Sequence, residues 1–90
     1  MTMKKSNATE QLEIMAEHLT GLIQELVHKP KDVKVEVSTS DDKHVFTITV
    51  ASEEVGMVLG KHGKTIQSFR HIYRSIAAKS GLLIDIQVLQ

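Results

Sequence analysis

Two glycines bracket a lysine and a histidine in the second half of the chain, at Gly60-Lys61-His62-Gly63. Glycine accepts positive φ and has no Cβ, so a turn built on it lets a ligand approach the main chain closely. Amide groups at the start of a following helix point outward without partners, and the helix dipole favours an anion there. This arrangement suits phosphate groups, although the same spacing also describes an ordinary exposed corner between two helices.

Two other glycine motifs can be compared with this stretch. Gly63-Lys64-Thr65 imitates the end of a Walker A loop, but that motif requires a glycine five positions before Gly63, where Val58 stands. A dinucleotide-binding fingerprint also fails, because neither its glycine spacing nor its preceding strand is present. We therefore do not expect a bound nucleotide.

The remaining polar residues suggest no catalytic or metal chemistry. The five histidines have no cysteine partners and no H-E-x-x-H spacing, so we predict no metal site. Glu53 and Glu54 are adjacent in a predicted first helical turn, which suits capping better than acid–base catalysis. No nucleophile and base stand out as a pair. We expect no catalytic residue, no cofactor and no enzyme activity.

Charge is unevenly distributed along the chain, which has 90 residues, a formal net charge of zero and no cysteine. Residues 55–84 carry five basic residues and no acid, whereas residues 1–54 carry ten acids and six bases. Such an asymmetry produces a local positive field that attracts anions, although a solvated basic face is the alternative interpretation. A chain of this length forms one small domain, and without cysteine it cannot contain a disulfide.

The N-terminal residues are basic, but no continuous apolar segment follows them. We therefore expect neither a signal peptide nor a membrane span, and we expect a cytoplasmic location. Residues 1–7 are expected to form a flexible tail, and residues 8–90 a single domain.

The first predicted helix has apolar residues at three- and four-residue steps. Asn7 or Thr9 is predicted to cap it, and Pro30 to follow its end. Gly21, inside the helix, suggests that another element lies close to it. The predicted apolar face comprises Leu12, Met15, Ala16, Leu19, Leu22, Ile23, Leu26 and Val27.

Alternating apolar residues predict two strands, at 33–37 and 46–50, joined by a polar loop longer than the tightest hairpin turn. A third strand is predicted at 82–89. Between them, a short helix capped by Ser52 ends at Gly60, and a longer helix runs from Lys64 to about residue 79. The predicted core face of the longer helix comprises Ile66, Phe69, Ile72, Tyr73 and Ile76. The order α-β-β-α-α-β predicts an α+β domain with a three-stranded sheet and helices packed on one face.

An aliphatic pair, Val58-Leu59, stands before the glycine turn, and Ile66 stands three positions after it. This pattern resembles the signature of the KH domain, and the element order is similar to its type II (prokaryotic) form. The resemblance covers nearly the whole chain and is greatest to small bacterial stand-alone KH proteins of the KhpA type. It implies a non-catalytic protein whose loop clamps about four unpaired RNA nucleotides while their bases lie in a narrow groove.

The resemblance also implies roles for individual residues. The residues implied to clamp the RNA backbone are Gly60, Lys61, His62 and Gly63. Those implied to line the helical wall of the groove are Gly56, Met57, Leu59 and Ile66, although aliphatic residues at such spacings also build a core. Further phosphate contacts are expected from Lys64, Arg70 and Arg74. For Arg70 and Arg74 the alternative is that they only keep the helix soluble.

The three aromatic residues, Phe46, Phe69 and Tyr73, all fall on predicted core faces. RRM sheets and OB-folds need exposed aromatic rings on which bases stack. The absence of exposed rings in the predicted structure therefore favours a KH groove with aliphatic walls. It also implies modest affinity. No residue obviously reads the 2′-hydroxyl, so single-stranded DNA is a second possible ligand.

A protein-interaction module of the same fold, with weak or no RNA binding, is the alternative function. The resemblance implies a homodimer, or a heterodimer with a larger KH-containing protein of the Jag type. We place the predicted dimer face around Tyr73, Ile76 and Ala77. For the RNA-binding function, we expect an RNA chaperone or post-transcriptional regulator.

Overall fold

A computed structural model describes the backbone of residues 3–90 and the side chains of residues 8–90. The main elements are α1 (Met3–Leu26), β1 (Lys34–Ser40), β2 (Lys43–Thr49), α2 (Val55–Leu59), α3 (Lys64–Ala78) and β3 (Leu83–Val88). Three single-turn 3₁₀ segments join them, η1 (Pro30–Asp32), η2 (Ser52–Glu54) and η3 (Lys61–Gly63). The predicted α+β class and its element order are confirmed.

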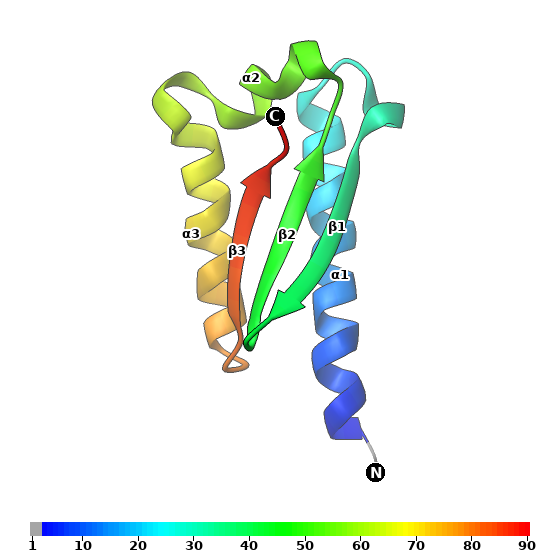
Figure 1. Ribbon diagram of the computed structural model, residues 1–90, viewed down its shortest axis with the longest axis vertical. Coiled ribbons are helices and arrows are strands. Elements are labelled where there is room, and N and C mark those ends of the chain that lie inside the picture. The colour runs from blue at the N-terminus through cyan, green and yellow to red at the C-terminus, as the bar shows by residue number, and fades with distance from the viewer. Residues whose placement is uncertain (1–2) are drawn as a thin grey trace.

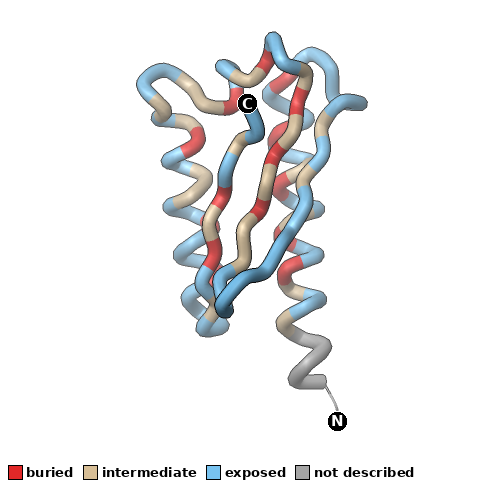
Figure 2. Tube along the Cα trace, in the orientation of Figure 1, coloured by how far each residue is buried: buried red, intermediate tan, exposed pale blue. Residues whose placement is uncertain are grey.

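The three strands form one mixed sheet in the order β1-β2-β3. β1 is antiparallel to β2, and β2 is parallel to β3. The long helices α1 and α3 both lie on the same face of the sheet, and α2 crosses one end of it (Figure 1). Apolar residues from β2, β3 and the two helices fill the space between these layers, where Figure 2 shows the buried positions. The prediction that helices cover one face is therefore confirmed.

The hairpin between β1 and β2 is tighter than predicted. Ser40 pairs with Lys43, which leaves only Asp41 and Asp42 in the turn, with φ of 51° and 67°. Two-residue turns with both residues at positive φ match the twist of the flanking strands, and aspartate tolerates this conformation better than most residues. The expectation of a longer loop over residues 38–43 was wrong.

α1 begins at Met3, before the cap positions predicted at Asn7 and Thr9. The flexible tail predicted for residues 1–7 includes two residues that lie outside the described part of the chain, and it stays a prediction. Leu22 and Leu26 are 47% and 37% exposed, so this part of the predicted apolar face is not buried. The sheet covers a narrower stripe of α1 than the apolar pattern suggests. The residues of α1 and its end that are buried are Leu12, Met15, Leu19, Ile23 and Val27.

A buried carboxylate fixes the position of α2 relative to α1. Glu54 is 4% exposed, and it accepts hydrogen bonds from the backbone N–H groups of His28, at 2.7 Å, and Lys29, at 3.1 Å. The predicted cap at Ser52 was wrong, because within the described residues no side chain caps η2 or α2. Glu53 and Glu54 do lie in a first helical turn as predicted, but it is the turn of η2, and α2 itself begins at Val55. The carboxylate instead joins the chain after α1 to the turn before α2.

Candidate nucleic-acid interface

The loop between α2 and α3 starts at Gly60, whose backbone has φ 78° and ψ 170°. This region is essentially restricted to glycine. A Cβ added to Gly60 would lie 2.2 Å from Oγ1 of Thr65 and 2.8 Å from its backbone N. Gly60 is therefore required by the protein's own turn. No sequence motif signals this contact with Thr65, which was not among the predicted site residues.

Gly63 differs from Gly60 in what surrounds it. Its backbone is left-handed, at φ 73° and ψ 15°, and so is that of His62, at φ 57° and ψ 26°. A Cβ added to Gly63 would meet nothing within 4 Å. The space beside Gly63 is thus open, and here the absence of a side chain leaves room for a ligand to reach the main chain.

The backbone amides of the loop divide into bonded and free groups. The N–H of Gly60 donates to the Gly56 carbonyl at 2.9 Å, and that of Gly63 to the Gly60 carbonyl at 3.0 Å. Within the described residues, no hydrogen bond has the N–H of Lys61 or His62 as its donor, and no side chain caps the start of α3. Unpaired amides beside a helix N-terminus can bind an anion.

The side chains nearest to these amides in the chain are those of Lys61, His62 and Lys64. Lys61, His62 and Lys64 are all exposed. In the part of the chain that the structure describes, neither Lys61 nor Lys64 takes part in a salt bridge. Their ammonium groups are therefore available to an external anion.

Arg70 and Arg74, by contrast, contact Asp85 on β3. Nη2 of Arg74 lies 2.8 Å from Oδ1 of Asp85, and Nε of Arg70 donates to the Ile86 carbonyl at 2.9 Å and lies 3.6 Å from the same carboxylate oxygen. Partial burial acts to raise the pKa of Asp85, but the hydrogen bond from the Ile86 N–H and the two guanidinium charges hold it below its usual value. The sequence places Asp85 just beyond the acid-free segment, and the fold brings it back to neutralise part of that charge.

The predicted groove wall is only partly at the surface. Gly56 is exposed, Met57 is 37% exposed, and Leu59 is half-buried against the core. Ile66 is 3% exposed and belongs to the core, so its side chain is not part of an accessible wall. A Cβ at Gly56 would meet nothing within 4 Å, which leaves space beside α2.

The fold and the loop together define a KH domain: a mixed three-stranded sheet, helices on one face, and a G-x-x-G turn between the second and third helices. The chain belongs to the family described as "KhpA/KhpB, KH domain", which it matches over residues 16–88. The suspected resemblance is therefore confirmed.

Relatives in several bacteria are similar to most of the chain. A protein of Chlamydia trachomatis named "RNA-binding protein KhpA" is 26% identical over 76 residues, which cover 84% of this chain and 97% of the relative. Proteins of the same name from Listeria monocytogenes and Clostridium perfringens are 24% and 25% identical, over 84% and 83% of this chain and the full length of each relative. No solved structure matches the chain.

Two further features were sought in the structure, a membrane-spanning helix and a metal-binding cluster. Among the described residues, no helix is both long and apolar enough to cross a membrane. The same residues contain no cluster of three or more His, Asp or Glu side chains that could hold a metal ion.

Proposed function

We propose that this protein binds single-stranded RNA and that its G-x-x-G loop clamps the backbone of about four nucleotides. The observation that carries the proposal is the set of unpaired amides at Lys61 and His62, next to the open side of Gly63. Lys61 and Lys64, which have no carboxylate partner in the described part of the chain, supply positive charge at the same place. The names of the relatives support RNA as the ligand. The KhpA/KhpB KH family is non-catalytic, in agreement with the prediction that this protein is not an enzyme.

The bases would lie against α2, where Gly56 leaves space and Met57 offers an exposed apolar side chain. Such a surface distinguishes bases weakly, because it offers few hydrogen-bonding groups. Neutralisation of about three phosphates predicts that log K falls with log salt at a slope of roughly −2, since each single-strand contact contributes about −0.7. Single-stranded DNA binds as well if no group reads the 2′-hydroxyl, and competition between matched oligomers tests this.

A backbone clamp with weak base preference suits a protein that acts on many transcripts. We therefore propose a cytoplasmic RNA chaperone or post-transcriptional regulator. Crosslinking and sequencing of RNA bound in cells would identify the transcripts. A single abundant target, in place of many, would contradict this role.

The clamp is tested by the double variant Lys61→Asp with His62→Asp. Both side chains are exposed, so the fold is retained while the loop repels phosphate. We expect RNA binding, measured by fluorescence anisotropy, to be abolished. The matched control is Lys31→Asp with Lys79→Asp, which removes more positive charge at exposed positions outside the loop. Equal losses in both double variants, or unchanged binding in the first, would show that the loop is not the clamp.

A protein-interaction module is the second candidate function, because α3 exposes two large apolar residues. Ile72 is 53% exposed and Ile76 is 40% exposed. The predicted face around Tyr73, Ile76 and Ala77 needs correction, since Tyr73 and Ala77 are 5% and 0% exposed and belong to the core. The homodimer and the heterodimer with a Jag-type protein stay predictions. Light scattering that shows a monomer at high micromolar concentration would remove the homodimer.

A further inference from the structure

Three basic side chains and one backbone amide converge on the carboxylate of Asp85 in β3, an edge strand of the sheet. Oδ1 of Asp85 accepts hydrogen bonds at 2.8 Å from both the Ile86 N–H and Nη2 of Arg74. Nε of Arg70 lies 3.6 Å from the same oxygen, and Nζ of Lys43 lies 3.9 Å from Oδ2. The groups that surround the carboxylate, here called the Asp85 cluster, are Lys43, Arg70, Arg74 and the Ile86 N–H.

The Asp85 cluster has more positive charge than its carboxylate neutralises. Among the described residues, Asp85 is the only acid that forms a salt bridge with any of the three basic side chains, so positive charge remains in excess. Guanidinium groups donate to carboxylates and to phosphates with the same paired geometry. The side chains of Arg74 and Asp85 are 54% and 30% exposed, so an external group can reach them. Asp85 therefore occupies a place whose donors also suit a phosphate group.

A basic surface on α3 joins the G-x-x-G loop to the Asp85 cluster. Lys64, Gln67 and His71 line one hollow along it, and the next hollow shares Gln67 and His71 and adds Arg70 and Arg74. No aspartate or glutamate lines either hollow. Residues at three- and four-residue steps lie on one side of a helix, and the ten steps from Lys64 to Arg74 span about 15 Å.

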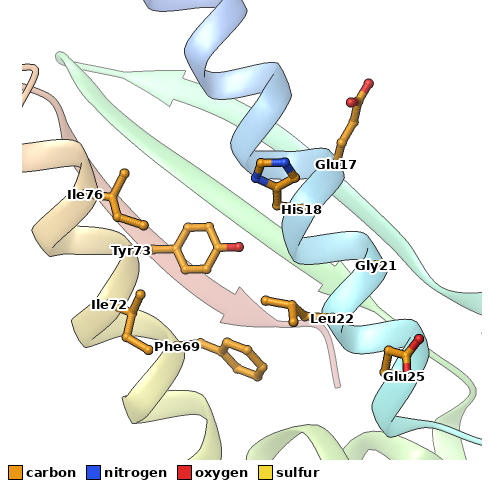
Figure 3. A pocket seen from close by; sticks show the side chains of 9 residues that line it. All are labelled: Glu17, His18, Gly21, Leu22, Glu25, Phe69, Ile72, Tyr73 and Ile76. Carbon is orange, nitrogen blue, oxygen red and sulfur yellow. The ribbon is translucent and has the colours of Figure 1, made fainter.

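The opposite side of α3 does not suit RNA. There, apolar residues of α3 face α1 across a hollow of about 650 Å³, which Glu17 and Glu25 also line and to which no lysine or arginine contributes (Figure 3). Gly21 lies in the same wall, and an added Cβ would meet nothing within 4 Å, so the prediction that another element of this chain lies close to it was wrong. The glutamates repel phosphate, so only the basic side of α3 attracts an RNA strand.

We propose that the Asp85 cluster is a second phosphate site for a bound RNA strand, which reaches it along the basic side of α3, and that Asp85 occupies this site in the free protein. The proposal rests on RNA binding at the G-x-x-G loop and adds a site to it. A phosphate group must displace the carboxylate of Asp85, which lowers the affinity for strands longer than the roughly four nucleotides held by the loop. Removal of the Asp85 charge should therefore strengthen the binding of such strands.

Asp85→Asn tests the proposal with two RNA oligomers, one of about four nucleotides, which covers the loop alone, and one of about ten. NMR titration measures both affinities, and circular dichroism checks the fold. The longer oligomer should bind roughly threefold more tightly than to the unchanged protein, since an exposed ion pair changes an equilibrium by up to about fivefold. Its salt slope should steepen from roughly −2 to roughly −3, because one more phosphate adds about −0.7. Affinity for the short oligomer should not change, because charges more than about 8 Å apart are largely screened at physiological salt.

Two further variants locate the effect. Glu36→Gln is the matched control, because it also removes an acid paired with a lysine, Lys34 at 3.7 Å, but it lies on β1 at the opposite edge of the sheet. It should leave both affinities unchanged. Arg74→Gln should weaken binding of the longer oligomer more in the Asp85→Asn protein than in the unchanged protein, because Arg74 is then free to contact phosphate. Equal losses in the two backgrounds would overturn the proposal.

Failure of the second site can be told apart from failure of the loop clamp. No gain from Asp85→Asn, or an equal gain from Glu36→Gln, overturns the second site, and the clamp still stands if Lys61→Asp with His62→Asp abolishes binding of the short oligomer. If that double variant binds as tightly as the unchanged protein, the clamp is wrong and the second site falls with it.

Discussion

Alanine is expected to affect the two loop glycines differently. At Gly60 the backbone lies in a region that costs other residues about 1–3 kcal/mol. The added Cβ would also stand 2.2 Å from Oγ1 and 2.6 Å from Cβ of Thr65, and overpacking of this kind costs a further 1–3 kcal/mol or so. At Gly63 only the left-handed backbone opposes alanine, at about 1–2 kcal/mol.

These values convert into a difference in thermal stability. For a domain of this size, each kcal/mol lowers Tm by about 4–8 °C. Gly63→Ala should lower Tm by roughly 9 °C, and Gly60→Ala by roughly 24 °C or enough to prevent folding, from the middle of each range. Circular dichroism at 222 nm during heating measures both. Adding Thr65→Ala to Gly60→Ala should restore only part of the loss, because the backbone N of Thr65 would remain 2.8 Å from the new Cβ. Equal decreases in Tm for the two glycine variants would refute this reasoning.

Gly63→Ala also separates RNA binding from folding. Well below its Tm the variant is folded, but its methyl group stands in the open space that the RNA backbone is proposed to occupy. Its RNA affinity should therefore fall more than that of the Lys31→Asp, Lys79→Asp control. Unchanged affinity would place the RNA contact on another side of the loop.

Three further predictions concern stability. Glu54→Ala should lower the unfolding free energy by about 2 kcal/mol or more, because it leaves two backbone N–H groups without their acceptor. Urea titration measures this loss, and Glu53→Ala at an exposed position is the control that should have a smaller effect. The pKa of Asp85 is lowered in the folded protein. Its contribution to folding stability is therefore fully present above its unfolded pKa of about 3.9 and is lost as pH falls through the lower folded pKa. Urea unfolding should therefore show a decrease below about pH 4 that Asp85→Asn lacks, of at most about 1 kcal/mol because the ion pairs are largely solvated. Gly21→Ala should raise the unfolding free energy by about 1 kcal/mol and Tm by about 4–8 °C, because alanine favours a helix more than glycine does and the added methyl group meets open space. A lower Tm in a melting curve would contradict the open environment of Gly21.

Sequence patterns predicted the element order because each element carries its own local signal. The apolar repeat of α1, the alternation of β2 and the glycines around η3 are all read within a few residues of the chain. The same patterns overestimated the core, since Leu22 and Ile72 continue an apolar stripe that is wider than the surface covering it. Periodicity shows which side of a helix is apolar, but the neighbouring elements determine how much of that side is buried.

The contacts that were not predicted join residues far apart in the chain. Glu54 binds backbone groups of residues 28 and 29, and Asp85 pairs with Arg70 and Arg74 on another element. Neither contact has a spacing that a motif can describe. For the loop, the motif predicted a turn at Gly60 and Gly63, and both have positive φ, but it assigned both glycines the same purpose. Only the three-dimensional surroundings show that Thr65 explains the first and open space the second.

The zero net charge of the chain conceals an uneven distribution of charge along α3 and the loop before it. Among the described residues Lys61 and Lys64 form no salt bridge, whereas Arg70 and Arg74 further along α3 both contact Asp85. The positive charge that is not paired with a carboxylate is therefore concentrated at the loop. If RNA binds as proposed, this charge lies beside the amides of Lys61 and His62, and the two arginines contribute less to binding because Asp85 offsets part of their charge.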